Sequence, residues 1–183
     1  TLKAAYEMFF SENALNPMAF KSLRRMEAEV VRMAANLFHG GPTAVGTMTS
    51  GGTESILMAV KAARDRGKGK LKKGMRPSIV APETIHPAFD KAAAYFGLDI
   101  RYARLGADYR ADVRDLESLI DATTVLLAAS APQYPHGVVD PIGDVSEIAL
   151  RRKIPFHVDA CVGGYVLPWV ERLGYRVPLW DFR

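Results

Sequence analysis

Cysteine and long apolar runs are both scarce in this sequence. Cys161 is the single cysteine among 183 residues, which excludes an internal disulfide framework and favours a reducing compartment. No stretch reaches the roughly 18 apolar residues that span a bilayer, and the amino-terminal residues lack the basic and then apolar order of a signal peptide. We therefore expect no membrane-spanning segment and a cytoplasmic location.

A large excess of charge of one sign is also missing. Lys and Arg number 24 against 20 Asp and Glu, which gives a formal net charge of +4 and does not by itself indicate a nucleic-acid partner. The one dense basic run, residues 68–76, is interleaved with glycines and contains no aromatic side chain that could stack on a base. We interpret it as a solvated loop and expect no nucleic-acid partner.

Apolar periodicity predicts alternating helices and strands within one globular core. Helical spacing recurs in five segments, at 17–38, 56–66, 87–96, 113–120 and 144–152. Short apolar runs predict five strands, at 44–49, 78–81, 99–104, 124–129 and 155–158. This alternation is typical of an α/β protein whose mostly parallel sheet has helices on both faces. Ligands of such sheets bind beyond the carboxyl ends of the strands.

A glycine-rich segment, Ser-Gly-Gly-Thr-Glu-Ser at 50–55, separates the first predicted strand from a helix. Glycines let a ligand approach the backbone, and a helix N-terminus offers unpaired N–H groups, so the segment is typical of a phosphate site. An ordinary glycine turn with Thr53 or Ser50 as the N-cap explains the same spacing equally well. A Walker loop and a dinucleotide fingerprint are excluded, because no Lys follows the glycines and the third Rossmann glycine is absent.

Three further polar sites follow later strands. Asp159 follows the last predicted strand, His86 follows the second, and residues 130–137 follow the fourth and include Tyr134 and His136. Taken alone, Asp159 is more typical of a turn cap and His157 of a packed core histidine, and His86 is equally typical of an exposed helix start. Because parallel strands end at one edge, the four sites together predict a single ligand site. An anion cradle, a planar imidazole and a carboxylate are what a phosphorylated pyridinium cofactor requires.

Five ordered segments resemble the sphingosine-1-phosphate lyases, within the group II decarboxylase family that depends on pyridoxal 5'-phosphate (PLP). They are the stretch 13–41, Met-Thr-Ser-Gly-Gly-Thr-Glu-Ser-Ile-Leu at 48–57, His-Pro-Ala-Phe-Asp-Lys-Ala-Ala at 86–93, Tyr-Pro-His-Gly-Val-Val-Asp-Pro at 134–141 and His-Val-Asp-Ala-Cys-Val-Gly-Gly at 157–164. Related decarboxylases share single elements, but the set in this order is specific. The resemblance covers essentially the whole chain. It implies the large domain of fold type I, with active sites at a homodimer interface.

The resemblance also implies a domain organisation. Residues 1–41 would form an N-terminal helical segment packing on the large domain, and 42–183 would form an incomplete PLP-binding large domain. In the family, the lysine that forms the Schiff base with PLP lies on the following strand in a Ser-Ala-Asp-x-His-Lys stretch, which this sequence does not reach. We therefore expect a fragment that is inactive alone. Lys61, Lys91 and Lys153 lie in predicted helices or loops and are not assigned that role.

The resemblance implies a role for each matching polar residue around PLP. Gly52 and Thr53 would bind its phosphate, and His86 would stack on its ring. Asp159 would pair with the pyridine nitrogen, so the catalytic roles fall to this aspartate and to His86.

The same resemblance implies roles for three other residues. Cys161 and Ser130 would lie near the cofactor. Asn16 stands where many of these lyases have a histidine, in an Asn-Pro-Leu-His-Pro stretch, and would contact the substrate phosphate. No metal is implied.

The implied activity is PLP-dependent cleavage of a carbon–carbon bond. The substrate would be a phosphorylated sphingoid base such as sphingosine 1-phosphate, and the products a long-chain aldehyde and phosphoethanolamine. Two alternatives stay open. A PLP-dependent amino-acid decarboxylase would use the same cofactor contacts, and a non-catalytic phosphate- or nucleotide-binding module would account for the glycine turn alone. Residues 15–20 and 134–137 favour the lyase.

Overall fold

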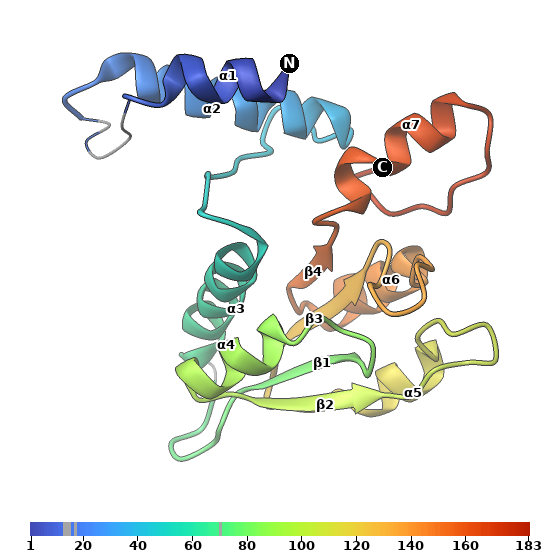
Figure 1. The fold of residues 1–183 in the computed structure, drawn as a ribbon. Helices are drawn as coiled ribbons and strands as arrows, with labels where there is room; N and C mark the ends of the chain where they lie inside the picture. The colour runs from blue at the N-terminus through green and yellow to red at the C-terminus, as the bar shows by residue number, and fades with distance from the viewer. Residues whose placement is uncertain (13–15, 17, 70) are drawn as a thin grey trace. The chain divides into compact units, whose positions relative to one another are not determined.

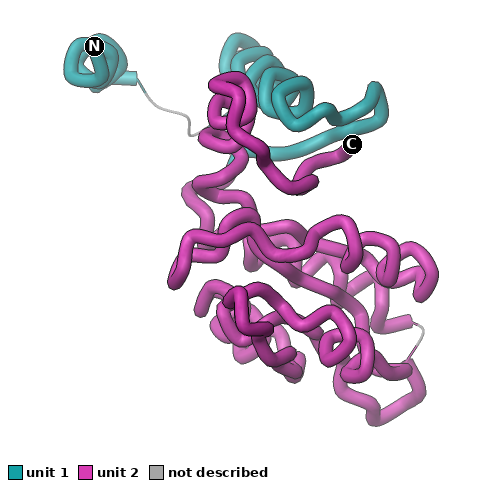
Figure 2. Tube along the Cα trace, turned by 90° about the vertical axis from the view of Figure 1, so that its right-hand side faces the viewer, with its two compact units in different colours: residues 1–48 teal, residues 49–183 magenta. Residues whose placement is uncertain are grey.

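The computed structural model describes residues 1–12, 16, 18–69 and 71–183, and these form two compact units, Thr1–Met48 and Thr49–Arg183. Figure 2 colours the two units separately. The first contains helices α1 (Leu2–Phe9) and α2 (Lys21–Leu37). The division at residues 41 and 42 stays a prediction. In the part of the chain just given, no helix combines the length and apolar character needed to cross a membrane.

The second unit is built on a four-stranded parallel sheet in the order β2-β1-β3-β4 (Figure 1). The strands are β1 (Ser78–Pro82), β2 (Asp99–Ala103), β3 (Thr124–Ser130) and β4 (Phe156–Asp159). Every residue of the central strands β1 and β3 is buried, whereas the edge strands are partly exposed. Continuous burial is what parallel strands covered on both faces require. The predicted fold class is therefore confirmed.

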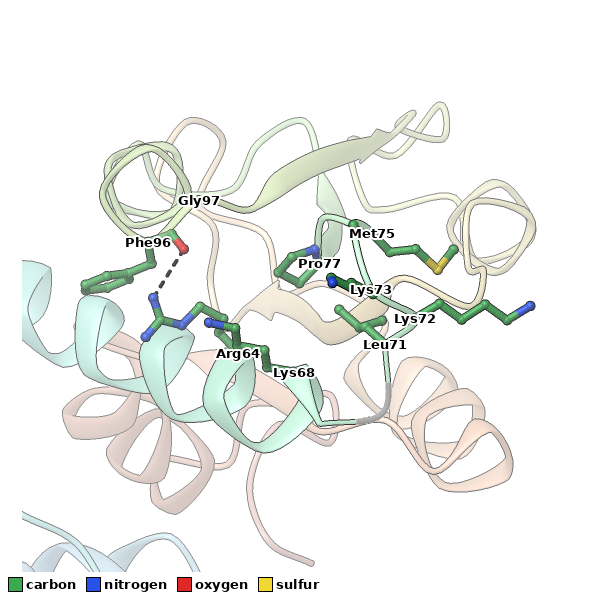
Figure 3. Close-up of a pocket in the computed structure, with 10 residues that line it drawn as sticks. Arg64, Lys68, Leu71, Lys72, Lys73, Met75, Pro77, Phe96 and Gly97 are labelled. Atoms are coloured by element: carbon green, nitrogen blue, oxygen red, sulfur yellow. Dashed lines mark hydrogen bonds between the residues drawn. The ribbon is translucent and has the colours of Figure 1, made fainter.

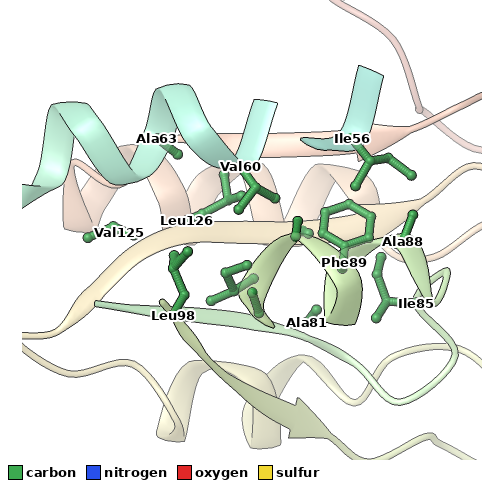
Figure 4. Close-up of a cluster of buried hydrophobic side chains, with 14 residues drawn as sticks. Ile56, Val60, Ala63, Ala81, Ile85, Ala88, Phe89, Leu98, Val125 and Leu126 are labelled. Carbon is green, nitrogen blue, oxygen red and sulfur yellow. The ribbon is translucent and has the colours of Figure 1, made fainter. Parts of the chain in front are cut away.

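Helices cover both faces of the sheet. They are α3 (Gly52–Lys68) and α4 (Ala88–Phe96) on one face, and α5 (Val113–Ser118) and α6 (Ile142–Arg152) on the other. Successive strand residues point to opposite faces of the sheet and pack in different hydrophobic cores. Ile79 packs with α3 and α4, whereas Val80 packs with α5 and α6. Figure 4 shows Val60 and Phe89 of the first core between helices and sheet. Two short helices that the sequence analysis missed, η1 (Gly163–Tyr165) and α7 (Leu167–Arg172), follow β4.

The strand predicted at 44–49 is not formed. The backbone of this segment bonds to side chains of α2 instead, because the Arg32 guanidinium donates to the Ala44 carbonyl at 3.2 Å and the Glu27 carboxylate accepts the Met48 N–H at 3.0 Å. A strand needs the backbone of a neighbour to complete its ladder. The prediction was wrong because an apolar run carries no information about such a neighbour.

The observed starts of two helices, α3 and α2, differ from the predicted ones. The helix predicted at 56–66 begins at Gly52, because Gly51 is its N-cap and the Ser55 N–H donates to the Gly51 carbonyl at 3.0 Å. Apolar periodicity detects only its buried face and misses the polar first turn. Helix α2 begins at Lys21, and Pro17, the predicted start, lies outside the described residues.

Gly163 allows the segment after β4 to pass directly against the loop after β3. A Cβ placed on Gly163 would lie 1.7 Å from the Ala131 carbonyl oxygen and 2.7 Å from Pro132 Cδ, so only glycine fits here. The Ala131 N–H also donates to the Asp159 carbonyl at 2.8 Å. These contacts hold the two segments together where the strands end.

We expect Gly163→Ala to lower the free energy of unfolding by about 3 kcal/mol, because the backbone must move to admit a methyl group. Gly143→Ala is the matched control, since the nearest atom to a Cβ there, Leu179 Cδ2, is 3.7 Å away and alanine favours the α6 helix. Chemical denaturation of both variants measures the difference. Equal stabilities would contradict the close approach at Gly163.

Candidate active site

A cavity of about 590 Å³ lies at the carboxyl edge of the sheet. Its volume is typical of sites for small molecules and cofactors. Its walls come from the first turn of α3, the segment after β1, the loop after β3 and the end of β4. Seven of the sequence-predicted residues line it: Gly52, Thr53, His86, Ser130, Tyr134, Asp159 and Cys161. The expected convergence at one edge of a parallel sheet is therefore confirmed.

The first turn of α3 supplies the anion-binding part of the cavity. Gly51, the N-cap, has no side chain that could bind the N–H groups of that turn. These N–H groups can therefore donate hydrogen bonds to an anion. A Cβ on Gly52 would lie 2.8 Å from Cys161 Sγ. The absence of a side chain at Gly52 therefore leaves room for the Cys161 sulfur beside the first turn of α3.

Ser50 and Glu54 fix the turn that precedes this helix. The Glu54 carboxylate accepts both the backbone N–H and the hydroxyl of Ser50, each at 2.6 Å. The hydroxyl and then the N–H of Ser50 lower the pKa of Glu54. The carboxylate is thus satisfied by the turn itself, as in a capping arrangement.

His86 presents its imidazole to the cavity from the segment between β1 and α4. The Ala88 N–H donates to His86 Nδ1 at 3.1 Å, so Nδ1 is an acceptor and the neutral ring carries its proton on Nε2. The ring of Tyr134 packs edge-on against it, with centroids 5.6 Å apart. These two contacts fix the orientation of a planar surface beside the anion cradle.

Asp159 and Ser130 lie at the ends of adjacent strands, paired in register in β4 and β3. The Asp159 carboxylate accepts the Cys161 N–H at 3.2 Å. Partial burial of its sulfur, together with the neighbouring carboxylate, raises the pKa of the Cys161 thiol to about 11. Cys161 is therefore a neutral thiol at physiological pH, and Asp159 is the acidic group among the residues that line the cavity.

His157 of β4 is not among the residues that line the cavity. His157 packs edge-on against Phe89, with ring centroids 5.7 Å apart. Burial lowers the pKa of His157, although the charge of Asp159 acts in the opposite direction. His157 is therefore a packed histidine. Asn16 belongs to the first unit, where its side-chain oxygen accepts the N–H groups of Met18 and Ala19 at 3.1 and 3.2 Å. Its substrate role stays a prediction.

Sequence reasoning missed Gln133, which is buried beside the cavity. Its side-chain amide donates to the Tyr109 carbonyl at 3.2 Å and its oxygen accepts the His136 N–H at 2.8 Å. The available signal was a polar residue in the segment that follows an apolar strand. Such a residue is indistinguishable from an exposed loop residue until its partners are known.

A second cavity, of about 340 Å³, lies at the opposite edge, beside the residues that precede β1 and β2. Basic side chains from the end of α3 and the loop after it line this cavity, including Arg64, Lys68 and Lys73 (Figure 3). The Arg64 guanidinium covers the ring of Phe96 at 5.3 Å. The basic run is thus separated by the length of the sheet from the cavity that holds Asp159.

The first cavity has the features of a site for a planar, phosphorylated ring cofactor in an α/β fold. One cavity of suitable volume brings together a helix N-terminus without a side-chain cap, an oriented imidazole and a carboxylate. These residues fit PLP, since they supply an anion cradle, a stacking surface and an acidic partner for the ring nitrogen.

The conserved domain of pyridoxal-dependent decarboxylases matches residues 13–181, and the chain belongs to this family. Sphingosine-1-phosphate lyase 1 of Rattus norvegicus is 50% identical over 184 residues, which cover 100% of this chain and 32% of the relative. The solved structure of a sphingosine-1-phosphate lyase from Burkholderia pseudomallei superposes with a TM-score of 0.89 at 41% identity, over 100% of this chain and 44% of that chain. The fold is fold type I, and PLP is the cofactor of the family.

A third relative is a probable L-tyrosine/L-aspartate decarboxylase of Methanothrix thermoacetophila, 42% identical over 180 residues that cover 98% of this chain and 44% of the relative. The chain thus spans about a third to less than half of the curated relatives it matches. Membership in an enzyme family favours the two enzymatic interpretations over a non-catalytic phosphate- or nucleotide-binding module.

We expect Cys161 to react with iodoacetamide about 100-fold more slowly at pH 8 than an unperturbed thiol, because a pKa near 11 leaves little thiolate. Asp159→Asn removes the neighbouring charge, so it should lower this pKa and accelerate labelling. Mass spectrometry of the peptide that contains Cys161 measures both rates. Faster labelling in the unmodified protein than in Asp159→Asn would contradict the proximity of thiol and carboxylate.

Proposed function

We propose that the protein is a PLP-dependent carbon–carbon lyase that cleaves sphingosine 1-phosphate and related phosphorylated sphingoid bases. The products are a long-chain aldehyde and phosphoethanolamine. The observation that carries this proposal is the 50% identity with a sphingosine-1-phosphate lyase along 100% of this chain, together with one cavity lined by the residues that PLP requires.

Each residue of the cavity has a distinct task in this proposal. Gly52 and Thr53 hold the cofactor phosphate with backbone N–H groups at the positive end of α3. His86 holds the ring by stacking, in the orientation that the Ala88 N–H imposes. Asp159 keeps a proton on the ring nitrogen. When bound, PLP supplies the electron sink for the bond cleavage.

The remaining predicted residues support the same proposal. Ser130 and Cys161 flank the cofactor from the ends of β3 and β4, and the neutral thiol adds no charge beside Asp159. Asn16 contacts the substrate phosphate. In the described part of the chain no lysine lines the cavity, so we also propose that these 183 residues are inactive alone and take the reactive lysine from elsewhere in the protein.

We also propose that the full-length protein is a homodimer located in the cytoplasm. Large apolar side chains of α1 and its flanks are exposed, among them Leu2, Phe9 and Phe10. Exposed apolar surface of this kind supports a contact with further protein. Light scattering of the full-length protein, with a mass of two chains expected, measures the state of assembly.

Amino-acid decarboxylation is the second candidate function. It is supported by the 42% identity with the Methanothrix decarboxylase along 98% of this chain. The residues assigned to PLP serve either reaction, because both need the same electron sink. The products separate the two: the lyase releases a long-chain aldehyde from sphingosine 1-phosphate, and a decarboxylase releases carbon dioxide from L-tyrosine, L-aspartate or L-glutamate.

We expect the full-length protein to release aldehyde from sphingosine 1-phosphate, and Asp159→Asn to reduce its turnover about 100-fold or more, since a neutral pyridine is a poor electron sink. Asp144→Asn, an exposed carboxylate in the first turn of α6, is the control and should leave turnover unchanged. Aldehyde and carbon dioxide are measured in parallel. Release of carbon dioxide from the amino acids, with no aldehyde from sphingosine 1-phosphate, would show that the protein is a decarboxylase and not a lyase. Full turnover in Asp159→Asn would refute the role of this carboxylate.

A further inference from the structure

Asp140 is a buried carboxylate that no proposed role uses. Its exposed fraction is 0%. One carboxylate oxygen accepts the Ser130 N–H at 2.9 Å and the other accepts the Ala111 N–H at 3.1 Å. Its own N–H donates to the Ser130 carbonyl at 3.0 Å. Burial raises the pKa of Asp140 while the two N–H donors oppose this shift. A buried acid that accepts two backbone N–H groups fixes the positions of those groups.

The backbone that Asp140 binds carries one wall of the cavity. Ser130 ends β3 and begins the loop 131–139, which supplies Gln133 and Tyr134 to the lining. Because Asp140 bonds to Ser130 through both its carboxylate and its backbone, it closes this loop at its base. The position of the wall therefore depends on the geometry at Asp140.

The second partner of Asp140 belongs to a turn outside the cavity lining. Ala111 forms a β-bridge with Leu105, and the Gly106 N–H donates to the Arg110 carbonyl at 2.8 Å. This closed turn follows β2 and is the support to which the loop 131–139 is bound. The Asp140 carboxylate is thus shared between the support and the wall.

Gln133 makes a second connection between the same two segments. Its exposed fraction is 1%, and its side-chain amide reaches the Tyr109 carbonyl of the turn at 3.2 Å. The ring of Tyr109 stacks on His136 of the loop, with centroids 4.6 Å apart and planes at 23°. Loop and turn are therefore joined at the base by Asp140 and in the middle by Gln133.

We propose that Asp140 is a positioning residue for the cofactor cavity, which it shapes by binding Ser130 and the loop 131–139 to the turn at 105–111. It touches neither cofactor nor substrate and acts through Ser130 and Tyr134. The inference rests on the proposed function only in taking PLP as the ligand of the cavity.

Asp140→Asn in the full-length protein tests this proposal. The amide presents an NH₂ group to one of the two backbone N–H donors, so the shared contact is lost. We expect about a tenfold or larger loss of PLP affinity, a weaker visible circular-dichroism band per bound PLP, and faster hydrogen exchange in 131–139. A residue with a merely structural role would lower the melting temperature and leave the circular-dichroism band of bound PLP unchanged.

Asp112→Ala, which removes both hydrogen bonds of this carboxylate, is the matched control. Asp112 also accepts two backbone N–H groups, from Arg114 at 2.9 Å and Asp115 at 3.1 Å, but these belong to α5. We expect this variant to keep the PLP affinity and the circular-dichroism band of the unmodified protein. Equal losses in both variants, or none in Asp140→Asn, would overturn the proposal.

Hydrogen exchange in the unmodified protein without PLP keeps the proposal testable if Asp140→Asn does not fold. The N–H groups of Ser130 and Ala111 should exchange at least tenfold more slowly than those of residues 107 and 108, since the buried carboxylate binds them. Equal rates would overturn the role of Asp140. Failure of the unmodified protein to bind PLP would instead refute the proposed function, which separates the two claims.

Discussion

The common direction of the four strands is the constraint on which the site depends. Parallel strands end at one edge, so the segments that follow them meet there whatever their separation in the sequence. Ser130 and Asp159 pair at the ends of β3 and β4, and His86 follows β1 into the same cavity. Gly52 reaches it from the start of α3, which packs on the face that α4 also covers. The sheet therefore assembles a cradle, a ring surface and a carboxylate without any contiguous motif.

Close backbone approaches turn this shared edge into a defined cavity. Gly163 passes against the Ala131 backbone at a distance that no side chain would permit, and Gly52 lies against the side chain of Cys161. Asp140 then binds the base of the loop after β3 to the turn at 105–111, and Gln133 of that loop binds the same turn. Packing excludes other positions of the backbone, and buried polar contacts select one of those that remain. The shape of the cavity thus depends in part on Gly163 and Asp140, which do not line it.

Strand positions were predictable because burial on both faces leaves a continuous apolar signal. The observed ends of all four strands lie within one residue of the predicted ones, and the polar residues directly after them located the cavity. The segment 44–49 misled because a run of apolar residues does not reveal whether a neighbouring backbone exists. Asp140 and Gln133 escaped prediction for a related reason: their partners are backbone groups of other segments, which no local pattern encodes.

The central claim is that one edge of this sheet holds PLP, and an electron-density map of the full-length protein with PLP bound tests it most directly. The account predicts the phosphate about 3 Å from the N–H groups of Gly52 and Thr53. It also places the imidazole of His86 over the ring, with the Asp159 carboxylate at the ring nitrogen. A cofactor bound elsewhere, or one with its ring nitrogen far from Asp159, would contradict the account.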